Sequence, residues 1–264
     1  MKKLLVLILV LAACAPARTD CGLEWRRPMS VDMPGAGTVY VKWTAPAAVN
    51  GLSQKTVSIW IKHDDLTDDG TLFDLFGSGT NETFYLYFVA GSAQKIELAV
   101  STSATAGTWR TTNNVVTDTG LWYMVTVTYN NGSLSNDPIF YINGASVAIT
   151  ETSTPTGTID TGTSSDFYIG DPGATFNPNG RVADLRVYNT ILSAADILAL
   201  YNAGAFSPSY DTNLVFHAPL TNAKNLGGAD FNGYTLTSST TLVDRINCAV
   251  GTPSGSPLGS SSNP

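Results

Sequence analysis

The sequence predicts an all-β fold, a two-sheet antiparallel sandwich or jelly roll with one short helix in its C-terminal part. About ten short runs of alternating apolar and polar residues recur along the chain, with turn residues between them. One helical pattern, at residues 193–204, interrupts this series. Charged residues make up 13 % of the chain, against roughly 25 % in an average protein. The polar surface must therefore come from Thr, Ser, Asn and Gly.

The strands are predicted from alternation with a period of two. In Thr56–Lys62, for example, Val57, Ile59 and Ile61 share one face. An Asn143-Gly144 pair predicts a tight hairpin turn after Pro138–Ile142. The predicted strands are Thr38–Trp43, Thr56–Lys62, Phe84–Ala90, Ile96–Val100, Trp122–Tyr129, Pro138–Ile142, Ser146–Thr150, Asp166–Gly170, Arg181–Tyr188 and Leu214–Leu220. Short strands at such spacing favour a sandwich over a βαβ protein.

The predicted helix has start and stop signals at both ends. Ser193 is a good N-cap, and Asp196 three residues later nearly completes a capping box. Gly204 is a natural stop. The helix is too short to be stable alone in water, so its apolar face, with Ile197 and Leu200, must dock on the sandwich.

The closing strand and helix resemble a known family. The segment Gly180-Arg181-Val182-Ala183-Asp184-Leu185-Arg186-Val187-Tyr188, followed by the helix, is similar to the end of laminin-G-like, concanavalin-A-type jelly-roll domains. Four earlier segments match in the expected order: residues 56–62, 121–129, 140–144 and 166–170. The resemblance covers about residues 30–204. It implies two curved antiparallel sheets and, frequently, sugar or protein ligands.

The N-terminus has the pattern of an export signal. Two lysines precede an apolar run from Leu4 to Ala13, which is shorter than the roughly 20 residues that span a bilayer. Leu11-Ala12-Ala13-Cys14 resembles the lipobox of bacterial lipoproteins, in which the cysteine is acylated after cleavage. By this resemblance the mature protein would reach the cell envelope as an outer-membrane lipoprotein, because Ala15 follows the cysteine. An ordinary signal peptide cleaved nearby is the alternative.

The remaining cysteines, Cys21 and Cys248, flank the predicted domain. Export to an oxidising compartment permits a disulfide between them, although two free thiols are also open. We divide the chain into a signal peptide (1–13), a lipid-anchored tether (14–27), a jelly-roll domain (28–250) and a flexible Gly-, Ser- and Pro-rich tail (251–264).

Composition and motifs argue against two classes of function. The net charge is −7 and no basic cluster extends beyond Arg26-Arg27, so a nucleic-acid partner is not expected. The fold includes glycosidases that use paired carboxylates. None of the four glutamates is followed two residues later by Asp, and His63 and His217 lack a partner motif. We therefore expect no enzyme of the known types.

Calcium is the only cofactor for which the sequence offers a candidate site. The acidic stretch from His63 to Gly70 matches half of an EF-hand loop, but Phe76 stands where the bidentate Glu would be. Relatives often take a calcium ligand from the closing strand, at the position that is Ala183 here. Asp184, the next residue, should point to the opposite face of the strand. Calcium binding is thus in doubt, and the metal, if any, is unknown.

Trp109 is the best candidate for an exposed sugar-stacking ring, with Arg110 beside it and Asn113 nearby. Packing over a sheet end is nevertheless the favoured placement of Trp109. The loop at residues 171–179 is a second candidate edge for a ligand. The sequence leads to a non-catalytic, surface-attached module that binds a glycan or a protein. A structural role, as in a surface-layer, phage-adhesion or virion-associated protein, is the runner-up, and a polysaccharide-active enzyme of unrecognised subtype comes third.

Overall fold

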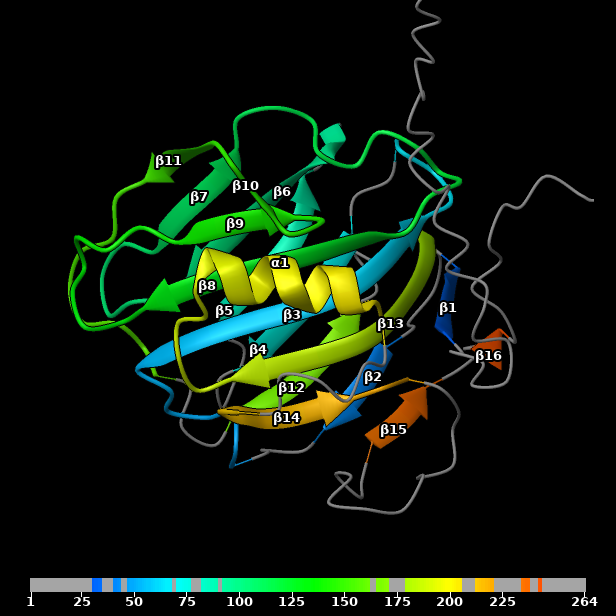
Figure 1. Cartoon of the computed structure of the whole chain (residues 1–264). Helices are drawn as coiled ribbons and strands as arrows, with labels where there is room; N and C mark the ends of the chain where they lie inside the picture. The colour runs from blue at the N-terminus through cyan, green and yellow to red at the C-terminus, as the bar shows by residue number, and fades with distance from the viewer. Residues whose placement is uncertain are drawn as a thin grey trace, which may run out of the picture. The chain divides into compact units, whose positions relative to one another are not determined.

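Two antiparallel sheets face each other across a shared apolar core (Figure 1). The computed structural model describes residues 30–34, 40–43, 47–67, 70–76, 82–89, 92–161, 165–170, 179–205, 212–220, 234–237 and 242–243, which all fall within the unit Pro28–Ile246. The predicted all-β sandwich with one short helix is confirmed.

Sheet A carries the helix on its outer face. Its strand order is β10 (Ala145–Val147), β9 (Ile139–Ile142), β8 (Tyr123–Asn130), β3 (Gln54–His63), β13 (Asn179–Tyr188), β1 (Ser30–Pro34) and β16 (Leu242–Val243), and β14 (Leu214–Ala218) also pairs with β13.

Sheet B forms the second layer. Its strand order is β11 (Ile149–Ser153), β7 (Gly107–Thr111), β6 (Ser92–Val100), β5 (Glu82–Val89), β4 (Gly70–Phe76), β12 (Asp166–Gly170), β2 (Tyr40–Trp43) and β15 (Tyr234–Thr237). Strands far apart in sequence thus become neighbours, as β12 does with both β4 and β2.

The core lies between the sheets and follows the predicted alternation. Val57, Ile59 and Ile61 of β3 are buried in it. Aromatic rings connect the layers, since Trp43 of sheet B meets Phe216 of sheet A edge-on with 5.1 Å between ring centroids. Each such buried side chain stabilises the fold by roughly 1.5–3 kcal/mol.

Helix α1 (Ala194–Ala203) has the predicted caps. Ser193 and Asp196 form a complete capping box, and Gly204 ends the helix with φ 81°. The helix lies against the outer face of sheet A (Figure 1), where Ile197 and Leu200 join a small second core with Met124, Tyr141 and Tyr188. No helix in the described part of the chain has the length and apolarity needed to cross a bilayer.

The hairpin between β9 and β10 is also confirmed. Asn143 and Gly144 both have positive φ, 52° and 80°, as a two-residue turn of this kind requires. A Cβ at Gly144 would lie 3.0 Å from the Leu198 backbone of α1, so glycine also permits the close approach of the helix.

The single strand predicted at Ser146–Thr150 is wrong. The chain crosses there from one sheet to the other, because β10 pairs with β9 in sheet A while β11 pairs with β7 in sheet B. Five other strands, β1, β4, β7, β15 and β16, were not predicted, since their alternation is short or interrupted by Gly and Pro.

Candidate functional site

The outer face of sheet B is the broad surface on which no described helix or strand lies. Side chains that alternate with the buried ones point to it from six strands. These are Tyr40 and Lys42 of β2, Tyr85 and Tyr87 of β5, Lys95, Glu97 and Ala99 of β6, Thr108 and Arg110 of β7, Thr150 and Thr152 of β11, and Asp166 and Tyr168 of β12.

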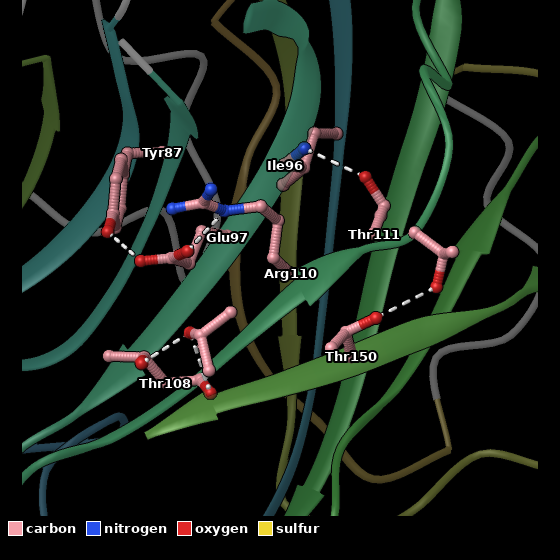
Figure 2. A network of polar contacts seen from close by, with 9 residues as sticks. Tyr87, Ile96, Glu97, Thr108, Arg110, Thr111 and Thr150 are labelled. Atoms are coloured by element: carbon pink, nitrogen blue, oxygen red, sulfur yellow. Dashed lines mark hydrogen bonds and ion pairs between the residues drawn. The ribbon is translucent and has the colours of Figure 1, made fainter.

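One row of polar side chains runs across neighbouring strands of this face (Figure 2). Strand register places Tyr87 opposite Glu97, Glu97 opposite Arg110, and Arg110 opposite Thr150. Arg110 donates from Nε to Glu97 Oε2 at 2.6 Å, and the Tyr87 hydroxyl donates to Glu97 Oε1. Three neighbouring strands therefore build one connected network, the Tyr87–Glu97–Arg110 row.

Burial differs sharply along the row. The Glu97 side chain is only 6 % exposed, whereas that of Arg110 is 37 % exposed. Burial, followed by the hydrogen bond to Glu97, raises the pKa of the Tyr87 hydroxyl above its ordinary value, so this hydroxyl stays protonated and acts as the donor. Both Glu97 oxygens are thus occupied from within the sheet.

The carboxylate of Glu97 fixes the orientation of Arg110. Arg110 bonds Glu97 through Nε, and its two terminal nitrogens have no partner among the described residues (Figure 2). A guanidinium offers planar donors and no acceptor. The row therefore presents preorganised donors on an open face of the sheet.

Threonine hydroxyls continue the polar surface toward the sheet edge. Thr108 and Thr152 share a hydrogen bond at 2.7 Å, and Thr112 and Thr150 share one at 3.2 Å. These cross-strand pairs hold edge strand β11 against β7 (Figure 2).

Aromatic rings flank the row on the side of β5. Tyr85 and Tyr87 are stacked, with 4.3 Å between centroids and 17° between ring planes. Ala99 of β6 lies opposite Tyr85 and Thr108, and contributes only a methyl group between them.

A second aromatic pair lies farther along the same face. Tyr40 and Tyr168 meet edge-on at 5.4 Å. Lys42 is bonded to Asp166 at 2.6 Å, and its pKa is raised chiefly by that bond. The charge of this lysine is therefore balanced locally.

The exposed ring predicted for Trp109 is wrong. Gly107, Trp109 and Thr111 are the buried positions of β7, so Trp109 points into the core, where its Nε1 donates to Asp137 Oδ1 at 2.8 Å. Gly107 makes room for it, because a Cβ there would lie 2.4 Å from the indole ring.

Of the other residues predicted with Trp109, Arg110 points to the outer face in the row above, and Asn113 is exposed in the turn after β7. Neither Glu97 nor Tyr87 was predicted. The patterns Tyr85-x-Tyr87 and Lys95-x-Glu97 put these residues on the polar faces of their strands, but nothing in the sequence paired β5, β6 and β7.

The residues of the closing strand do not fit the calcium site of relatives. Ala183 is buried, and its side chain offers no ligand atom. Asp184, at a bulge with φ 47°, accepts from Arg186 Nε at 3.2 Å and contacts His217 Nε2 at 2.7 Å. A carboxylate committed to two basic side chains is a poor calcium ligand. Among the described residues no group of three or more His, Cys, Asp or Glu is placed to hold a metal.

The acidic stretch after β3 shows a local turn. Asp65 Oδ1 accepts from the Thr67 backbone at 2.8 Å and from its hydroxyl at 2.7 Å, as in an Asx turn. Asp68 and Asp69 lie outside the described residues, as do residues 171–178 of the second candidate edge and Cys14, Cys21 and Cys248.

Comparison with known proteins places this architecture in a family. A family model of the concanavalin A-like lectin/glucanases superfamily matches residues 35–198. No curated protein sequence matches the chain.

Two solved structures share the fold. A heptameric SAP-like pentraxin from Limulus polyphemus has a TM-score of 0.53 and 16 % identity, over 85 % of this chain and 98 % of the pentraxin. A candidate carbohydrate binding protein from Bacteroides ovatus has a TM-score of 0.53 and 17 % identity, over 82 % of this chain and 61 % of that protein. The chain belongs to the concanavalin A-like lectin/glucanases superfamily, as its closing strand and helix predicted.

Proposed function

We propose that this chain is a non-catalytic module that binds glycans through the outer face of sheet B. The observation that carries the proposal is the Tyr87–Glu97–Arg110 row, in which a buried carboxylate holds an exposed guanidinium beside stacked tyrosine rings. Tyrosine rings offer an apolar surface to a sugar ring, and the guanidinium offers hydrogen-bond donors to its oxygens.

The state of the carboxylates supports a binding role over catalysis. Glycosidases of this fold need two carboxyl groups at a short separation, free to act on the substrate. On the outer face of sheet B, Glu97 is occupied by Tyr87 and Arg110, and Asp166 is bonded to Lys42. A carboxylate that is paired with a cation can orient that cation, but it is not free to exchange a proton with a substrate.

Attachment to the cell envelope is part of the same proposal. The lipobox-like residues before Cys14 support a lipid anchor, with the membrane contacted through that anchor alone. Residues 14–27 would then serve as the tether between the lipid and the domain. The Bacteroides ovatus protein of similar fold, a candidate carbohydrate binding protein, is consistent with this role.

A glycan array tests the proposal directly. The purified protein should bind a defined set of glycans, and Tyr85→Ala and Arg110→Ala should each reduce that binding. Lys62→Ala is the matched control, since Lys62 lies on the outer face of sheet A. Absence of binding to every glycan, or binding unaffected by both variants, would refute the proposed site, and self-association in light scattering would then favour an assembly role.

A further inference from the structure

We infer that the end of the site formed by β6 and β7 recognises an acidic glycan, through a carboxylate or sulfate group bound by Arg110 and Lys95. This inference rests on the proposed glycan-binding function and names the ligand class. The residues that form this basic corner are Lys95, Glu97 and Arg110.

The two cations lie near the end of the β6–β7 ladder. Glu97 opposite Arg110 is the last pair of this ladder, and Lys95 lies two residues beyond Glu97 on β6, within the bulge that β6 makes against β5 between Ser92 and Ile96. In a regular strand this offset corresponds to about 7–8 Å between the Cα atoms of Lys95 and Arg110. Lys95 is half-exposed and has no hydrogen-bond or ion-pair partner among the described residues.

The exposed charge at this corner is positive although the whole protein carries −7. The one carboxylate, that of Glu97, is buried behind the guanidinium and also receives the Tyr87 hydroxyl. Glu151, on the adjacent edge strand, pairs with Trp109 and therefore points to the opposite face from Arg110.

The acidic positions of β4 and β12 lie farther away. The backbone position of Asp74 in β4 is three strands from β7 and two strands from β6, about 14 Å and about 10 Å at the usual strand spacing. The separation from Arg110 exceeds the screening length of about 8–10 Å in physiological salt, and the separation from Lys95 is comparable to it. Asp166 lies one strand farther away and is bonded to Lys42.

The hydrogen-bonding capacity of the corner points to the same ligand class. Arg110 and Lys95 offer donors only, and both oxygens of Glu97 are already used. A neutral sugar hydroxyl brings a proton that needs an acceptor, whereas a carboxylate or sulfate brings acceptors alone. An acceptor-only anion thus matches the corner, and charge-assisted hydrogen bonds to it are the stronger kind.

Matched polysaccharides test the inference by affinity electrophoresis and calorimetry. Polygalacturonate is compared with its methyl-esterified form, and dextran sulfate with dextran, so that each pair shares a backbone and differs in charge. At least one acidic member should bind roughly 10- to 100-fold more tightly than its neutral counterpart, the size expected for charge-assisted hydrogen bonds. The two pairs also distinguish a carboxylate from a sulfate ligand.

Variants of the basic corner distinguish binding that needs a correctly oriented Arg110 from binding that depends only on net charge. Arg110→Gln, Arg110→Lys and Lys95→Gln should each weaken acidic binding. Glu97→Gln should weaken it too, although it makes the site more positive, because Arg110 loses the group that orients it. Lys62→Gln removes one positive charge from the opposite sheet and should have no effect, and thermal melting confirms that each variant is folded.

Three outcomes overturn the inference in different ways. If acidic and neutral polysaccharides bind with equal affinity, and Arg110→Gln still abolishes that binding, the glycan site stands but the preference for acidic glycans is refuted. Acidic binding that Arg110→Gln leaves unchanged, or that Glu97→Gln strengthens, shows attraction by net charge and not recognition at this corner. No binding to any polysaccharide or array glycan removes the proposed function itself.

Discussion

Lys55 offers the sharpest test of the energetics of this core. It lies on β3 among the inward-facing residues and is only 7 % exposed. Its Nζ is 4.7 Å from the centroid of the Phe84 ring, and no oxygen accepts from it among the described residues. Burial lowers the pKa of Lys55 from 10.5 to about 8. Replacing Lys55 by Met keeps an unbranched chain of similar length and removes the buried charge.

The size of the effect follows from proton linkage. Between pH 8 and 10.5 the unfolded chain binds a proton at Lys55 that the folded chain has lost, so stability rises with pH in this window. Below pH 8 the full penalty applies, which is about 3 kcal/mol at about 1.36 kcal/mol for each pH unit. The Phe84 ring offsets about 1 kcal/mol of it. Lys55→Met should therefore stabilise the protein at pH 7 by about 2–3 kcal/mol.

Urea unfolding followed by tryptophan fluorescence measures this difference. The advantage of Lys55→Met should narrow by about 2 kcal/mol between pH 7 and 9.5, because only the wild type gains stability with pH. Lys62→Met, at an outward-facing position of the same strand, is the matched control for the change of side chain. A Lys55→Met variant that is less stable than the wild type at pH 7, with a difference independent of pH, would show that folding satisfies the ammonium and would refute this reasoning.

Three further predictions concern the helix, the hairpin and the anchor. Ser193→Ala removes the N-cap that accepts from the Asp196 backbone and should cost about 1 kcal/mol in the same urea assay, with Ser193→Gly costing less. Gly144→Ala should cost more than about 1 kcal/mol, because φ is 80° and the new methyl would press on Leu198; a neutral effect would contradict the close packing of α1. Cys14→Ser should abolish incorporation of labelled fatty acid, and unchanged labelling would exclude the lipid anchor.

Most of the strand and helix pattern could be predicted because it is written in local periodicity. The alternation of β3 and the caps of α1 need only neighbouring residues, and both were confirmed. Other strands were missed where that local signal is weak. β1 has five residues and ends in Pro34, and β4 begins at Gly70, so their pairing partners define them more than their own sequences do.

Trp109 shows why the candidate site was only partly predicted. Its neighbours, Gly107 and Thr111, give no apolar alternation, so an exposed ring next to Arg110 was a reasonable expectation. The structure makes this segment a strand by pairing it with β6 and β11, and pairing sends Trp109 inward and Arg110 outward. Whether a tryptophan is a platform or a core residue thus depended on one strand that the sequence did not reveal.

Residue order alone was sufficient for the all-β class, the capped helix and the family, because these depend on spacing within short segments. The Tyr87–Glu97–Arg110 row required the tertiary structure. Its members are up to 23 positions apart in the sequence and meet only through the register of β5, β6 and β7. A shift of one residue in that register would send Glu97 to the core and leave Arg110 without its carboxylate. The binding face of this protein is therefore a property of how its strands pair.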